Sequence, residues 1–104
     1  MRIPNDDTLF EMVADYVCVA EFQSYEMVMS MARYPELVKT RRLVNVVMNQ
    51  MFGWSQTRIA KQWLQDHTSV GHGLRNMTDT ELQAAESLGY EIMDMLKNNE
   101  EVSQ

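Results

Sequence analysis

Apolar residues recur along this chain at intervals of three and four positions, the period of an amphipathic helix, and no stretch alternates as a half-buried strand does. The segment Thr8-Leu9-Phe10-Glu11 has the form of a capping box and predicts a first helix that begins there and frays near Phe22. Ser24 can cap a short second helix. Pro35 then ends that helix or opens the third, because a missing N–H does no harm in a first turn.

Four further helices follow from the same periodicity and from local start and stop signals. Gly53 suits the left-handed C′ position at the end of the third helix, and Ser55 can cap the fourth. Thr78-Asp79-Thr80-Glu81 is a second capping box that opens the sixth. The third to sixth helices are expected at about 36–52, 55–64, 67–76 and 79–97, with a frayed tail at 98–104. Gly89 lies inside the last of these, costs about 1 kcal/mol against alanine and could mark a bend. We therefore predict an all-α fold, a compact six-helix domain over residues 1–104.

Composition supports a single globular domain. The chain has 104 residues, of which 45% are hydrophobic, enough for one modest core. The single cysteine, Cys18, excludes an internal disulfide framework, fits a reducing cytoplasm and is expected to be a buried structural thiol. No apolar run approaches the ~20 residues that span a bilayer, and the N-terminus has no signal-peptide core. The ten methionines either fill an irregular core or line a groove for a partner helix.

Charge is strongly segregated along the chain. The net charge is −6, but residues 33–75 hold seven basic residues against two acidic ones, Glu36 and Asp66. The flanking segments 1–32 and 76–104 carry one basic residue each, Arg2 and Lys97, against six and seven acidic residues. Because exposed charges act over a Debye length of about 8 Å, an acidic protein can still present a basic face to an anionic partner.

The predicted helices at 55–64 and 67–76 have the dimensions of a helix-turn-helix. In that motif the N-terminal residues of the second helix enter the major groove of DNA while the first helix crosses the backbone. Asp66 can accept from a cytosine amine, and His67, Thr68 and Ser69 can bond or contact base edges. By spacing alone this pattern is weak, because many helical domains contain such a pair.

The residues themselves carry a more specific resemblance. One stretch resembles the signature of the C-terminal DNA-binding domain of the bacterial replication initiator DnaA: Asp66-His67-Thr68-Ser69-Val70-Gly71-His72-Gly73-Leu74-Arg75. In this chain, Ser69 stands where the signature has a threonine. Ser55-Gln56-Thr57-Arg58-Ile59-Ala60 is similar to the start of that family's helix-turn-helix, and Lys39-Thr40-Arg41-Arg42 to the start of its long helix. The resemblance covers about residues 8–80 and implies a free-standing domain with a DnaA C-terminal, Trp-repressor-like fold.

This resemblance implies three kinds of DNA contact. Arg33 would enter the minor groove from the loop before the long helix. The residues expected at phosphates are Lys39, Arg41, Arg42, Arg58, Lys61 and Arg75, with Gln56 and Thr57 at the backbone or a base edge. The residues expected to read the major groove are Asp66, His67, Thr68 and Ser69, whereas His72 would hold structure.

The chain also departs from the family pattern. Its basic loop keeps only Arg33, Thr40 and Asn49 stand where the family has proline and lysine, and the turn between the motif helices is one residue shorter. Gly71 and Gly73 inside the recognition helix cost about 0.5–1 kcal/mol each, and either permit a close approach or leave the helix mobile. We therefore expect modest affinity, or affinity that rests on dimerisation or a partner.

Other interpretations of the same residues stay open. Asp66 could serve only as the N-cap of the fifth helix, and the cluster at 39–42 could be a solvated face. No catalytic arrangement and no phosphate-binding Gly-x-x-x-x-Gly-Lys loop is present, so we expect neither an enzyme nor a cofactor. His67 and His72 lie about 140° apart on a helix, so a metal site shared by them is not expected.

Two functions follow. The first is sequence-specific binding of double-stranded DNA in replication or transcription control, in the cytoplasm at the nucleoid. The second is a protein-interaction module that keeps the DnaA-like fold and uses the acidic first and last helices and the methionines to bind a replication or transcription protein. The sequence leaves the oligomeric state and the target site open.

Overall fold

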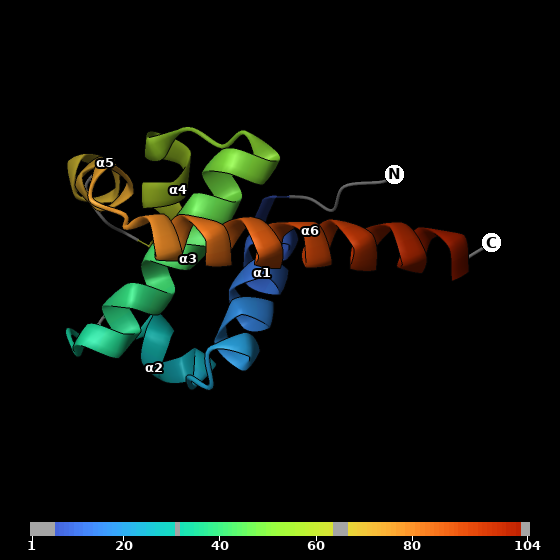
Figure 1. Ribbon diagram of the computed structural model, residues 1–104, viewed down its shortest axis with the longest axis horizontal. Coiled ribbons are helices and arrows are strands. Elements are labelled where there is room, and N and C mark those ends of the chain that lie inside the picture. The colour runs from blue at the N-terminus through green and yellow to red at the C-terminus, as the bar shows by residue number, and fades with distance from the viewer. Residues whose placement is uncertain (1–5, 31, 64–66, 103–104) are drawn as a thin grey trace.

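Six helices make up the computed structural model, which describes the backbone of residues 6–30, 32–63 and 67–102 (Figure 1). They are α1 (Asp6–Ala20), α2 (Tyr25–Met29), α3 (Pro35–Phe52), α4 (Gln56–Trp63), α5 (His67–Arg75) and α6 (Asp79–Val102). The described segments contain no strand, so the prediction of an all-α, six-helix fold is confirmed. No helix among the described residues is both long and apolar enough to cross a membrane.

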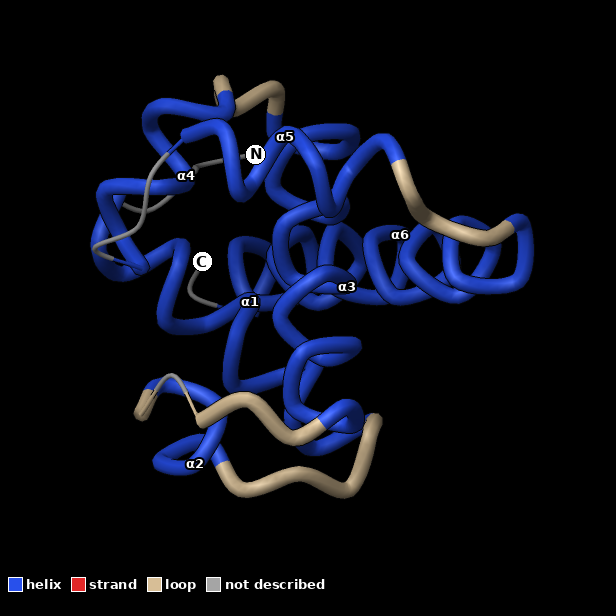
Figure 2. The backbone as a smooth tube through the Cα atoms, turned by 90° about the vertical axis from the view of Figure 1, so that its left-hand side faces the viewer, coloured by secondary structure: helices blue, strands red, loops and turns tan. Residues whose placement is uncertain are grey.

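Helix α3 is the centre of the molecule, because each of the other five helices packs against it. In Figures 1 and 2, α4 and α5 gather at one end of α3 and α2 lies at the other, while α6 crosses α3 and continues beyond α1. Val44, Val47 and Met48 of α3 are fully buried, as are Val13 and Val17 of α1. Burial of each such side chain contributes about 1.5–3 kcal/mol, so the contact between α1 and α3 is a main part of the core.

An aromatic cluster attaches α4 to this core. Phe10 of α1 meets the ring of Trp63 edge-on at a centroid distance of 5.0 Å and stacks near Trp54 at 6.4 Å. The buried indole nitrogen of Trp63 donates to Oδ1 of Asn45 on α3 at 2.6 Å. Because a buried N–H needs a partner, this bond fixes the angle at which α4 leaves the core.

The helix starts that the sequence predicted from caps are confirmed at α2, α4 and α6. The hydroxyls of Ser24, Ser55 and Thr78 accept from the backbone N–H three residues on, at 3.3, 3.2 and 3.1 Å. Gly53 ends α3 in the left-handed conformation with φ 71°, and Pro35 occupies the first turn of α3. These signals are local, which is why the sequence alone located them.

Three helix boundaries differ from those expected from the sequence. Helix α1 already includes Asp6, so Thr8 lies inside the helix and not at its cap; acidic residues at 6 and 7 favour an earlier start. Helix α6 extends to Val102, since 98–102 contain no glycine or proline to end it. Helix α1 ends at Ala20, two residues before Phe22: Phe22 turns the chain with φ 58°, and Gln23 N–H donates to the Cys18 carbonyl at 2.9 Å.

Gly89 serves a close approach between helices. A Cβ at this buried position would collide with the Met51 side chain of α3, so glycine lets α6 lie directly against α3. Gly73 differs, because a Cβ there would meet only Arg42 Cγ at 3.5 Å, an ordinary contact.

We predict opposite effects from adding one methyl group at these two glycines. Gly89→Ala should lower the free energy of unfolding by about 1–3 kcal/mol, because Met51 must move. Gly73→Ala should raise it by about 0.5–1 kcal/mol through helix propensity. Urea denaturation followed by circular dichroism measures both, and equal effects of the two substitutions would contradict the packing of α6 on α3.

Candidate nucleic-acid interface

Helices α4 and α5 form the predicted helix pair, packed against one another and against α3. Their observed spans, Gln56–Trp63 and His67–Arg75, are shorter by one or two residues than the predicted 55–64 and 67–76. Asp66 and the rest of the connection lie outside the described residues, as do the side chains of His67, Thr68 and Ser69. The backbone of residues 67–69 forms the first turn of α5.

Helix α5 is seated by its apolar face and by one glycine. Val70 is buried and Leu74 is half-buried against the core. A Cβ on the buried Gly71 would lie 2.5 Å from Gln56 Oε1, so glycine makes room for the Gln56 side chain at the start of α4. Gln56 is therefore half-buried between the two helices, and of the two expected backbone contacts at this turn Thr57 is the exposed one.

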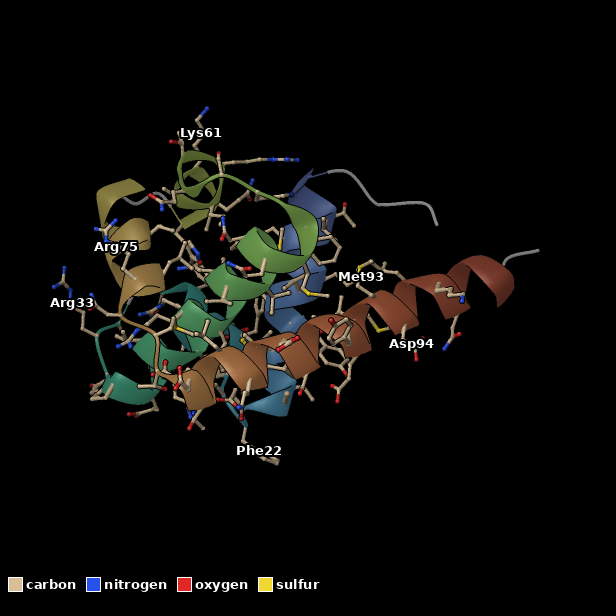
Figure 3. All side chains as sticks on the ribbon, turned by 45° about the horizontal axis from the view of Figure 1, so that its top comes forward. Phe22, Arg33, Lys61, Arg75, Met93 and Asp94 are labelled. Atoms are coloured by element: carbon tan, nitrogen blue, oxygen red, sulfur yellow. The ribbon has the colours of Figure 1, made fainter. Side chains whose placement is uncertain are left out.

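Exposed cations from three segments surround this helix pair. Arg33 comes from the loop between α2 and α3, Lys61 from α4 and Arg75 from the last turn of α5. In Figure 3, Arg33 and Arg75 project along one edge of the molecule and Lys61 projects from the outer side of α4. Three separate segments thus present positive charge around the helix that carries the motif residues.

Arg41 corrects the sequence prediction. Its side chain is only 7% exposed, its Nε donates to the Val28 carbonyl at 2.7 Å, and one Nη donates to the Met27 carbonyl at 3.4 Å. Burial lowers the pKa of the guanidinium. Arg41 therefore satisfies the C-terminal carbonyls of α2 and joins α2 to α3, instead of facing a phosphate.

Lys39 and Arg42 remain at the surface but lie beside carboxylates. Lys39 Nζ is 3.7 Å from Glu21 Oε1, a largely exposed pair of little energetic weight. Arg42 Nη1 is 3.6 Å from Glu81 Oε2, and that oxygen is buried and accepts no hydrogen bond within the described part of the chain. Glu81 thus places a poorly satisfied negative charge next to an arginine expected at DNA.

Arg58 has a second contact that the sequence did not indicate. Its guanidinium lies 4.0 Å from the centroid of the Trp54 ring, and the residue is exposed. A guanidinium stacked on an indole keeps its charge and its hydrogen-bond donors at the edge. The ring orients Arg58 at the first turn of α4, where Thr57 is also exposed.

Sequence reasoning missed the residues that support this surface from within. Asn49, where the DnaA pattern has lysine, donates from Nδ2 to the Trp54 carbonyl at 2.9 Å and holds the turn between α3 and α4. Asn45 performs the equivalent task for Trp63. The sequence did offer one indication of these contacts, two asparagines within a long helix, since buried amides need hydrogen-bond partners.

Other site chemistry has little support among the described residues. No group of three or more His, Cys, Asp or Glu side chains gathers there at metal-binding distance. Cys18 is buried, as expected, and burial together with the nearby Asp15 charge raises the pKa of its thiol. A raised pKa disfavours the reactive thiolate, in keeping with a structural role for Cys18.

Comparison of the chain with models of protein families, with curated proteins and with solved structures found no match. The likeness to the DnaA C-terminal domain therefore rests on the residues of the motif and its flanking segments alone.

We predict that two neighbouring arginines differ in their effect on stability. Arg41→Ala should lower the free energy of unfolding by about 1.5–3 kcal/mol, because two carbonyls of α2 lose a charged donor. Arg42→Ala should change it by less than about 1 kcal/mol, since its ion pair is partly solvated. Thermal and urea unfolding of the two variants provide the comparison, and equal losses would contradict the internal role of Arg41.

Proposed function

We propose that this protein binds double-stranded DNA sequence-specifically through a helix-turn-helix made of α4 and α5, in the manner of a free-standing DnaA C-terminal domain, in replication or transcription control. The observation that carries the proposal is the Asp66–Arg75 motif on and before α5, surrounded by exposed cations from three segments. Helix α5 would enter the major groove by its N-terminal end, with Asp66, His67, Thr68 and Ser69 at base edges.

The remaining contacts would position the protein on the duplex. Lys61, Arg75 and Arg58 are the phosphate contacts that the exposed surface supports best, and Thr57 can donate from the first turn of α4. Arg33 would reach the minor groove beside α5. Arg41 has no part in this scheme because it is committed to α2.

The distribution of exposed and paired basic residues favours specificity of DNA binding over affinity. Phosphate contacts supply much of the strength of DNA binding and nearly all of its salt dependence. Two of the expected phosphate residues, Lys39 and Arg42, are accompanied by carboxylates, and a third, Arg41, is internal. The base-reading motif is nearly complete by comparison, so binding should be weak at physiological salt and selective among sequences.

Selection from a pool of random-sequence duplexes, followed by affinity measurements at several salt concentrations, tests the proposal. His67→Ala should weaken binding to the selected site by about 1–3 kcal/mol and relax its specificity. Arg33→Ala should weaken binding, and Lys61→Ala should reduce the salt slope by about one. Lys97→Ala is the matched control, because it removes an exposed lysine from α6.

The result that overturns the proposal is equally concrete. It is absence of an enriched site at about 50 mM salt, or binding that responds to His67→Ala and Lys61→Ala no more than to Lys97→Ala.

We further predict that Glu81→Gln strengthens DNA binding. The substitution removes the charge beside Arg42 but keeps a side chain compatible with the cap at Thr78. Affinity should rise about two- to fivefold, as expected from release of a partly exposed ion pair. Glu86→Gln, an equal change of charge one to two turns along α6, should leave affinity nearly unchanged, and an equal gain from both would reduce the effect to net charge.

A further inference from the structure

A groove of about 330 Å³ runs between α3 and α6 on a surface that the proposed DNA contacts do not use. Val46 and Ala85 are buried and form its floor, with Met51 beside them. Leu82 and Tyr90 form its walls and are 40% and 61% exposed. Exposed apolar surface around a hollow is characteristic of a site that another molecule covers.

The apolar surface continues along α6. Leu82, Glu86 and Tyr90 are spaced by four residues and so share one face of the helix. Beyond Tyr90 a second hollow, lined in part by Met93, Asp94 and Lys97, extends the same surface toward the C-terminal half of α6. A stripe of this length and spacing suits an elongated ligand such as a helical peptide segment better than a compact small molecule.

Carboxylates border the stripe. Glu86 lies at the groove and Glu91 and Asp94 lie at the second hollow, against Lys97 as the basic residue of that lining. Glu91 accepts a hydrogen bond from the Tyr16 hydroxyl at 2.7 Å, which holds that carboxylate at the α1–α6 contact. A second copy of this chain would bring the same carboxylates face to face, so charge opposes self-association and favours a basic ligand.

We propose that this stripe is the docking site for a basic, amphipathic helical segment of a partner protein. An aliphatic or aromatic side chain of the partner would enter between Leu82 and Tyr90, over the adaptable Met51 side chain. Lysine or arginine residues beside that anchor would pair with Glu86, Glu91 and Asp94.

The C-terminal part of the stripe lies away from the exposed cations. In Figure 3, Met93 and Asp94 lie toward the opposite end of the molecule from Arg33 and Arg75. The proposal does not rest on DNA binding, because none of the stripe residues belongs to the α4–α5 surface.

A peptide-display library of random sequences, selected against the full chain, provides the probe. We expect enriched peptides that combine lysine or arginine with an apolar anchor. Tyr90→Ser with Leu82→Ser should weaken a selected peptide by at least about tenfold, as loss of a central anchor does. Glu86→Gln with Asp94→Asn should weaken it less and reduce its salt dependence. Phe22→Ser, at a 94% exposed apolar residue elsewhere, is the matched control.

Amide chemical shifts of the labelled protein then locate the bound peptide. Shifts centred on Leu82, Ala85 and Tyr90 support the proposal. Enrichment of acidic or uncharged peptides overturns it, as does equal binding to the double serine and Phe22→Ser variants. A dimer in light scattering that dissociates in the double serine variant would overturn it in favour of a second copy.

Discussion

The structure depends on the burial of the middle of α3, residues 43–48, around the whole circumference of the helix. Every residue from Leu43 to Met48 is buried, and so are Thr40 and Arg41 one turn earlier. The buried part of this helix has no solvated face, so each polar residue buried there must find a partner within the protein. Arg41 bonds the carbonyls of α2, and Asn45 accepts from Trp63. The bonds of Arg41 hold α2 at one end of α3, and the bond of Asn45 holds α4 at the other.

That constraint also decides what becomes of the positive charge in residues 33–75. The long helix begins with three closely spaced cations, and enclosure draws Arg41 inward while Lys39 and Arg42 stay near the surface. The exposed cations around the helix pair lie on short segments at the periphery: Arg33 on a loop, Arg58 and Lys61 on α4, and Arg75 on α5. A count of basic residues along the chain therefore overstates the basic surface.

The sequence predicted best those features that depend on a few neighbouring residues. The caps at Ser24, Ser55 and Thr78 and the turn at Gly53 are of this kind. It could not predict features that depend on contact between distant segments. Helical periodicity predicts one buried face, but the middle of α3 is buried all round because five helices pack against α3. Gly89 could be explained only once Met51 was seen against it.

The same distinction applies to the candidate site. The motif Asp66–Arg75 can be recognised from the sequence, because the proposed base recognition requires particular residue types at fixed spacing along one helix. The position of Glu81 next to Arg42, where it offsets the charge of the arginine, cannot be predicted from the sequence, because Glu81 lies on α6 and Arg42 on α3. For Glu81, the sequence indicated only the capping box that it shares with Thr78.

The two proposed surfaces carry opposite charge, and each would attract a ligand of the other sign. The α5 end offers cations to an anionic polymer, while the C-terminal half of α6 offers carboxylates to a cationic segment. Added salt weakens both kinds of contact in the same direction, so salt dependence alone cannot assign a binding event to one surface. Single-site charge changes can, because Lys61 and Glu86 lie on separate helices and each belongs to only one surface. A ligand that loses affinity when the Lys61 cation is removed, and hardly responds when the Glu86 carboxylate is removed, binds as an anion at the α5 end. A ligand that loses affinity when the Glu86 carboxylate is removed, and hardly responds to loss of Lys61, binds as a cation on α6.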